Sequence, residues 1–175
     1  TSSRRQRQMC IRDSYLTESK IKVRPGIMRL INELKEKGIR LGLVSSTSEV
    51  NLLNLFEKGL KIDHKQIFDI VAHGDSTPNK KPSPEIYEWA LEKLRLPSQA
   101  CIAIEDSPRG LDASLKANIS TIVTPSILTL GEEFKGAKLV VSDLGEPDRA
   151  FELIAGKDFG HKFVDTDLLS KVIDI

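Results

Sequence analysis

The sequence predicts an α/β domain with a Rossmann-like three-layer architecture, in which helices cover both faces of a parallel sheet. Amphipathic helical patterns alternate with short apolar runs along the chain, as expected for parallel strands joined by crossover helices. Hydroxyl or charged residues follow several of these runs, at the strand ends where open sheets bind ligands. Hydrophobic residues make up 39% of the chain, which suits a packed core, and no apolar run is long enough to span a bilayer.

The predicted elements follow in chain order. The first helix begins at Pro25 and ends before Gly38, because the apolar residues between them recur at helical spacing. Ser83 is expected to cap a later helix that begins at Pro84. The other predicted helices cover residues 49–58 and about 109–117, and the predicted strands cover residues 40–44, 68–72, 101–104, 121–123 and 138–141.

Two adjacent carboxylates, Glu105 and Asp106, end the apolar run 101–104, and Lys81 precedes them in a Lys-Pro-Ser-Pro segment. Neighbouring carboxylates repel each other unless a cation lies between them, which favours a Mg²⁺ site. Ser45 and Ser46 follow the predicted strand 40–44. Their hydroxyl and backbone N–H groups suit a phosphate oxygen at a helix N-terminus, and Lys81 suits the charge of the same phosphate.

Each of these residues also has a purely structural interpretation. The hydroxyl cluster 45–48 suits the cap of the following helix, and Glu105 with Asp106 suits the next helix N-terminus and its dipole. Lys81 by itself resembles a solvated loop lysine. The histidines are interpreted as structural, because nothing in the sequence resembles a zinc-ligand spacing or a Ser-His-Asp set.

In their order along the chain, three stretches together resemble the second, third and fourth motifs of the haloacid-dehalogenase-like (HAD) phosphohydrolases. They are the strand that ends at Ser45, the segment 81–87 and the segment 104–113. The resemblance covers about residues 22–148. Within the family the chain is similar to the CbbY-like branch, close to beta-phosphoglucomutase, through residues 24–27, 68–70, 74–75, 80–84 and 144–148.

The resemblance implies a Mg²⁺-dependent phosphatase of phosphorylated sugars. In this family an aspartate of an Asp-x-Asp motif attacks a phosphate monoester, and water then hydrolyses the aspartyl-phosphate. Ser45 would hydrogen-bond the transferring phosphoryl group, Lys81 would neutralise its charge, and Glu105 with Asp106 would hold Mg²⁺. The implied substrate class is a sugar bisphosphate such as xylulose-1,5-bisphosphate. The alternatives are a beta-phosphoglucomutase-type phosphosugar mutase and, from another class, a non-catalytic binding protein.

The chain departs most from the family pattern at the first motif, because no Asp-x-Asp pair follows a strand upstream of the other motifs. Residues 4–14 translate the DNA of a transposase-type sequencing-library adapter, so residues 1–14 are interpreted as foreign and residues 15–175 as a partial HAD core domain. The nucleophile is therefore expected to lie upstream and to be missing from this chain. Nearly all of the helical cap is expected to be missing as well, and so is the strand that relatives place between the strands ending at Ser45 and Glu105. Such a chain is predicted to be inactive and poorly stable.

Charge and cysteine content limit the partners and the cellular compartment that the sequence predicts. The chain carries a formal net charge of +1, and the four arginines and one aspartate of residues 4–14 contribute +3 of it, which leaves the remainder slightly acidic. A nucleic-acid-binding arm is therefore not expected. Cys101 is the only cysteine outside that segment, which excludes an internal disulfide. We expect a monomer that binds neither nucleic acid nor membrane, in the cytoplasm or, in a photosynthetic eukaryote, in the plastid stroma.

Overall fold

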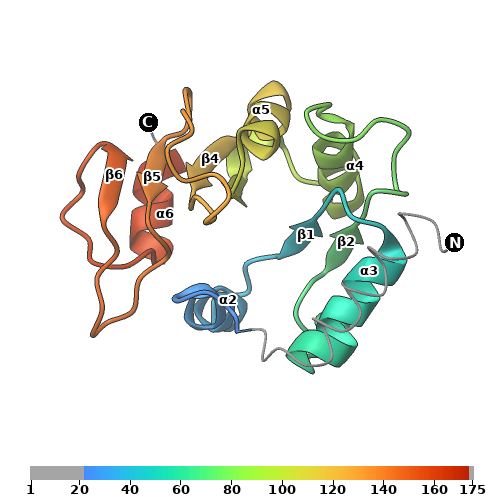
Figure 1. The fold of residues 1–175 in the computed structure, drawn as a ribbon, viewed down its shortest axis with the longest axis horizontal. Coiled ribbons are helices and arrows are strands. Elements are labelled where there is room, and N and C mark those ends of the chain that lie inside the picture. The colour runs from blue at the N-terminus through green and yellow to red at the C-terminus, as the bar shows by residue number, and fades with distance from the viewer. Residues whose placement is uncertain (1–21, 174–175) are drawn as a thin grey trace, which may run out of the picture.

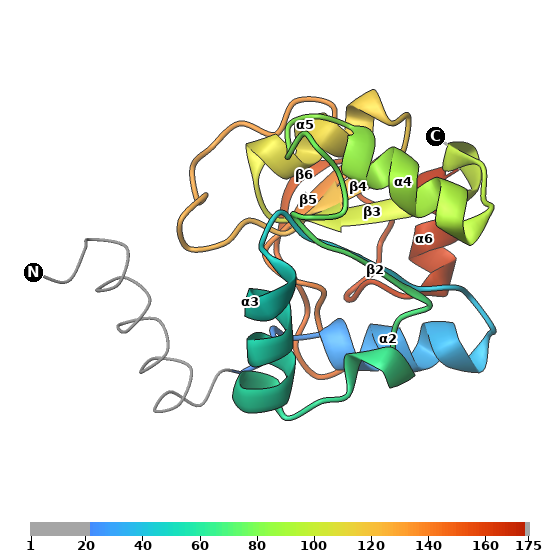
Figure 2. The same cartoon turned by 90° about the vertical axis from the view of Figure 1, so that its right-hand side faces the viewer.

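The computed structural model describes residues 22–173, in which helices and strands alternate. The helices are α2 (Ile27–Glu36), α3 (Glu49–Asn54), α4 (Glu85–Leu94), α5 (Pro108–Lys116) and α6 (Thr166–Ile173). The strands are β1 (Gly42–Val44), β2 (Ile70–Ala72), β3 (Ile102–Glu105), β4 (Ser120–Val123), β5 (Leu139–Val141) and β6 (Leu153–Gly156). Helices α4 and α5 lie on one side of the strands and α2 and α3 on the other, so the predicted three-layer α/β class is confirmed (Figures 1 and 2).

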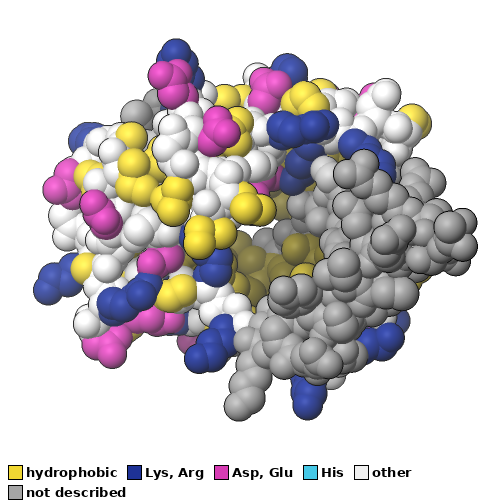
Figure 3. Space-filling model, in the orientation of Figure 1, with side chains coloured by type: hydrophobic (Ala, Val, Ile, Leu, Met, Phe, Trp, Pro, Cys, Tyr) yellow, Lys and Arg dark blue, Asp and Glu magenta, His cyan; other side chains and the backbone are white. Residues whose placement is uncertain are grey.

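The strands form two separate sheets within residues 22–173. Strands β1 and β2 pair in parallel, and the second sheet has the order β3-β4-β5-β6. In the described chain β1 and β3 are open edges, and Figure 1 shows the space that separates them. At the same place the molecular surface has a hollow with hydrophobic side chains on its floor (Figure 3). The division falls where the sequence predicts that a central strand is missing.

The helix layers hold the two sheets together. One buried cluster joins α2 and α6 to β4 and β5, and contains Leu30, Leu34, Ile122, Leu139, Val141, Leu144, Val164, Leu168 and Val172. A second cluster joins β2 and β3 through α4 and α5, and contains Ala72, Ile86, Tyr87, Ala103, Ala113, Ala117 and Ile119. The second cluster crosses the division of the sheet. Apolar packing between α4 and α5 therefore replaces the strand pairing that is absent between β1 and β3.

The helix ends follow the local sequence. Gly26 adopts φ 80° before α2, and a Cβ at this position would lie 2.5 Å from the carbonyl oxygen of Gly145, so only glycine fits. Gly38, just past the end of α2, also has a positive φ of 67°. Helix α5 begins at Pro108, and the side chain of its N-cap, Ser107, accepts the Gly110 N–H at 3.2 Å.

Several predicted boundaries were wrong. The strand predicted over 40–44 begins at Gly42, because the Leu41 N–H donates to a side-chain oxygen of Asp69 at 2.7 Å instead of to a strand carbonyl. The helix predicted over 49–58 is α-helical only to Asn54 and continues as a π-helix over Leu55–Leu60. Helix α4 begins at Glu85, one residue after the predicted start, with Pro84 as its N-cap.

The prediction that residues 138–141 form the last strand was also wrong, because β6 and α6 follow β5. Strand β6 pairs antiparallel with β5, so the second sheet is mixed. The four residues of β6 are half-buried or exposed and show no alternation of apolar and polar side chains. Leu153, Ile154 and Ala155 form a short apolar run that the prediction did not assign to a strand, and the pairing with β5 decides their conformation.

Candidate active site

Lys81 joins the two sheets at the carboxyl ends of their strands. Its ammonium donates to the backbone carbonyl of Val44, the last residue of β1, at 3.1 Å and to the Glu105 carboxylate at the end of β3. The side chains of Lys81 and Glu105 are only 10% and 7% exposed. The structural interpretation of Lys81 as a solvated loop lysine is therefore wrong, and the lysine connects the ends of β1 and β3.

Glu105 is held by three separate elements. Its Oε1 accepts hydrogen bonds from Lys81 and from the hydroxyl of Tyr87 in α4. Its Oε2 lies against the first turn of α5, where a Cβ on Gly110 would come within 1.8 Å of that oxygen. Burial raises the pKa of Tyr87 above its ordinary value, and the charge and hydrogen bond of Glu105 and the charge of Asp106 raise it further. The tyrosine hydroxyl therefore keeps its proton and stays a donor.

Asp106 is exposed, unlike Glu105, and its backbone carbonyl accepts the Thr129 hydroxyl at 2.6 Å. Neither carboxylate caps α5, because Ser107 does so, which removes the capping interpretation of the pair. Within residues 22–173 no three histidine, cysteine or acidic side chains converge to hold a metal ion. Mg²⁺ commonly takes one or two protein carboxylates and completes its shell with water and substrate phosphate, so the pair of Glu105 and Asp106 fits the ion.

Ser45 lies at the end of β1, one residue beyond the carbonyl that Lys81 contacts. Its hydroxyl accepts the Thr47 N–H at 3.3 Å, and Ser46 is half-buried in the same loop. The N-cap of α3 is Ser48, but the Glu49 N–H donates to the Asp75 carboxylate at 3.2 Å. Asp75 therefore takes the capping role that the structural interpretation gives to the hydroxyl cluster.

The residues predicted from sequence thus lie at neighbouring strand ends, with Lys81 as the direct link between them. The prediction gave no role to Tyr87, although it belongs to the third motif, because its contact with Glu105 depends on how α4 packs. It also gave no role to Arg109, whose guanidinium donates to the Lys81 carbonyl at 2.7 Å. The only signal for that contact in the sequence is the position of the arginine, three residues after Asp106 and next to a proline.

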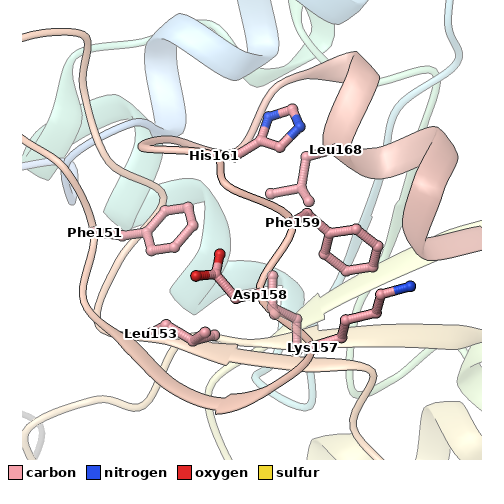
Figure 4. Close-up of a pocket in the computed structure, with 8 residues that line it drawn as sticks. Phe151, Leu153, Lys157, Asp158, Phe159, His161 and Leu168 are labelled. Carbon is pink, nitrogen blue, oxygen red and sulfur yellow. The ribbon is translucent and has the colours of Figure 1, made fainter.

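Two pockets in the described chain lie away from these residues. One, of about 10 Å³, is surrounded by side chains of the β6 region and α6 such as Phe151, Phe159 and Leu168 (Figure 4), and it has room for about one water molecule. The other, of about 90 Å³, lies between α3 and β2 beside His64 and His73. None of the predicted site residues lines either pocket. In the described part of the chain, no helix has the length and apolar character needed to cross a membrane.

Comparison with known proteins identifies the family. A family model described as haloacid dehalogenase-like hydrolase matches residues 5–124. The protein CbbY of Cereibacter sphaeroides is 40% identical over 133 residues, which are 76% of this chain and 58% of that protein. The phosphorylated carbohydrates phosphatase of Thermotoga maritima is 34% identical over 102 residues, 58% of this chain and 46% of that protein.

Solved structures agree with these relatives. A mutant CbbY from Rhodobacter sphaeroides, in complex with xylulose-(1,5)bisphosphate, superposes with a TM-score of 0.71 at 40% identity, over 75% of this chain and 58% of that one. The beta-phosphoglucomutase of Clostridium difficile gives 0.67 at 26% identity, over 97% of this chain and 65% of that one. The matched part spans between 49% and 58% of the first curated relatives. The family match over residues 5–124 shows that the chain belongs to the haloacid dehalogenase-like hydrolases, among which it is similar to the CbbY proteins.

Proposed function

We propose that this chain carries the phosphate-binding and Mg²⁺-binding part of a phosphatase site for phosphorylated sugars, with xylulose-1,5-bisphosphate as the first candidate substrate. The observation that carries the proposal is the position of Lys81, which touches the end of β1 and Glu105 at the end of β3. Lys81 thus lies one residue from Ser45 along β1 and in contact with Glu105, the residue before Asp106. The relatives support the substrate class, because one similar protein is a phosphorylated carbohydrates phosphatase and another binds xylulose-(1,5)bisphosphate.

The residues divide the work of phosphoryl transfer, which depends mostly on positioning and on charge stabilisation. Lys81 would balance the negative charge of the transferring phosphoryl group, and the Ser45 hydroxyl would donate to one of its oxygens. Backbone N–H groups around Ser46 would orient the same group. Glu105 and Asp106 would hold Mg²⁺, which supplies further charge neutralisation at the phosphate when bound.

The sequence upstream of Tyr15 decides whether the protein has a nucleophile. We place it on an Asp-x-Asp strand encoded before Tyr15. We also propose that residues 1–14 are foreign to the protein, although the family match begins at residue 5. The described chain has one Asp-x-Asp pair, Asp165 and Asp167, but Asp165 accepts the Leu168 N–H at 2.8 Å near the start of α6, and Asp167 pairs with Lys171. That pair serves the helix and does not replace the nucleophile.

Sequencing the gene upstream of the codon for Tyr15 is the first test. A strand that ends in Asp-x-Asp, followed by a helical cap, supports the proposal and supplies a longer chain to assay. That chain should release inorganic phosphate from sugar bisphosphates only with Mg²⁺, and Lys81→Met should slow release about 10²- to 10³-fold. Lys116→Met, at an exposed lysine, is the control and should leave the rate unchanged. A start codon close to Tyr15 would overturn the enzyme assignment in favour of a binding protein.

A beta-phosphoglucomutase-type mutase is the second candidate, because the Clostridium difficile beta-phosphoglucomutase matches 97% of this chain. A mutase returns the phosphoryl group to a sugar, whereas a phosphatase transfers it to water. The same assay separates them. Accumulating inorganic phosphate identifies the phosphatase, and a phosphosugar isomer formed without phosphate release identifies the mutase.

A further inference from the structure

We infer that Tyr87 is a positioning residue, which holds the Glu105 carboxylate and the Lys81 ammonium in the arrangement that the site requires. The inference rests on the proposed function, because it concerns the proposed Mg²⁺ ligand Glu105. Tyr87 lies in α4 and is only 6% exposed, in the buried cluster that joins the two sheets. Its backbone is therefore fixed by packing, and its side chain reaches the site from a rigid helix.

Tyr87 contacts both charged groups with different parts of its side chain. The hydroxyl donates to Glu105 Oε1, which also accepts from Lys81. The Lys81 ammonium lies 4.9 Å from the centre of the Tyr87 ring, within the range of a cation–π interaction. One side chain thus fixes the carboxylate by a hydrogen bond and supports the ammonium with its ring face.

The two oxygens of the Glu105 carboxylate differ in their contacts, because both hydrogen-bond donors bind Oε1. Within the described residues, Oε2 accepts no protein hydrogen bond, and it lies over the first turn of α5 at Gly110. Without the Tyr87 hydroxyl, the carboxylate would lose one of the two hydrogen bonds that orient Oε1 and would keep only that from Lys81. Partners that hydrogen-bond a ligating carboxylate typically change metal affinity 10- to 100-fold when they are removed.

Tyr87→Phe tests the inference, because it removes the hydroxyl and keeps the ring. The probe is Mn²⁺, whose free ion is counted by electron paramagnetic resonance, with Mg²⁺ as competitor. Wild-type chain should bind Mn²⁺ in competition with Mg²⁺, and Tyr87→Phe should bind it about tenfold more weakly. Trp89→Phe is the matched control, since Trp89 lies two residues along the same helix and is half-buried, and its affinity should equal that of wild type. Equal affinity of Tyr87→Phe and wild type would overturn the inference.

A second measurement separates this inference from the proposed function. If the wild-type chain binds neither ion, the Mg²⁺ site of the proposed function fails, and a double-mutant cycle on stability decides about Tyr87. Tyr87→Phe, Glu105→Gln and the double variant are unfolded in urea. If the two changes in the free energy of unfolding are not additive, the hydroxyl is coupled to Glu105 and the positioning role of Tyr87 is supported. If they are additive, that role is overturned.

Discussion

At the residue scale, two of the lysine–carboxylate pairs in the described chain differ sharply in burial. Lys81 and Glu105 are almost fully buried, whereas Lys116 and Asp112 in α5 are 51% and 50% exposed. A buried pair carries the desolvation of two charges, so the loss of one partner leaves the other charge unbalanced. An exposed pair loses little, because water and salt replace the missing partner.

Lys81→Met should therefore lower the free energy of unfolding by about 3 kcal/mol or more. Lys116→Met should lower it by less than about 1 kcal/mol. Urea denaturation followed by circular dichroism measures both. Similar small losses would show that water reaches Glu105 in solution.

Gly110 provides a second prediction at this scale. Alanine normally favours a helix over glycine by up to about 1 kcal/mol, but a Cβ here would meet Glu105 Oε2 at 1.8 Å. Gly110→Ala should therefore destabilise the chain by about 1–3 kcal/mol and displace Glu105.

Asp112→Ala is the control for Gly110→Ala, because it introduces the same residue at an exposed position of the same helix. Chemical denaturation of both variants checks the prediction. A Gly110→Ala variant as stable as wild type would mean that Glu105 moves aside at little cost.

At the scale of elements, α2 and the start of α6 are tied together by a carboxylate. Glu33 in α2 accepts the Thr166 N–H at 3.1 Å and the Thr166 hydroxyl at 2.7 Å, and Lys37 lies 3.2 Å away. Burial opposes ionisation of Glu33, but these hydrogen bonds and the Lys37 charge outweigh it. They hold the pKa of Glu33 below its ordinary value of 4.5.

The direction of this pKa shift sets the pH dependence. A carboxyl with a lowered folded-state pKa contributes stability above its unfolded pKa and loses it as the pH falls through the folded one. Glu33→Gln should cost about 1 kcal/mol at pH 7 and flatten the fall in stability below about pH 4.5. Urea midpoints measured from pH 7 to pH 3 check this, with Glu36→Gln, exposed on the same helix, as control. Parallel pH profiles for wild type and Glu33→Gln would contradict the role of Glu33.

At the scale of the whole molecule, the division of the sheet is the dominant feature of the described chain. Strand β4 has a partner on each side, whereas β1 and β3 each have one. Open edges leave alternate backbone groups without strand partners, and packing between α4 and α5 has to hold the halves together. The sequence-based prediction of poor stability rests on this division.

Hydrogen–deuterium exchange should show the division directly. Amides of β4 should exchange slowest, and amides of β1 and β3 should exchange about tenfold faster or more, because local opening exposes an open edge first. Mass spectrometry of peptides that cover each strand measures this. Protection of β3 equal to that of β4 would show that another segment pairs with its open edge in solution.

Local sequence signals predicted a large part of this molecule. The pattern around Leu30 and Leu34 predicts α2, and short apolar runs predict the strands up to β5, because each signal lies within a few residues. The short strand β6 was missed, although Leu153, Ile154 and Ala155 form a comparable apolar run. The start of β1 was also predicted two residues too early, because the conformation of Leu41 depends on Asp69, which is distant in the sequence.

The sequence by itself determined the family and the candidate site residues. Ser45, Lys81, Glu105 and Asp106 occur in the family order, and each motif is readable in a single short stretch. Only the tertiary structure decided what surrounds Glu105. Tyr87 and Lys81 reach it from outside its own strand, Gly110 leaves room for it, and the sheet divides beside it. The contacts of Tyr87 and Lys81 join residues 18 and 24 positions from Glu105, so they exist only once α4 has packed beside β3.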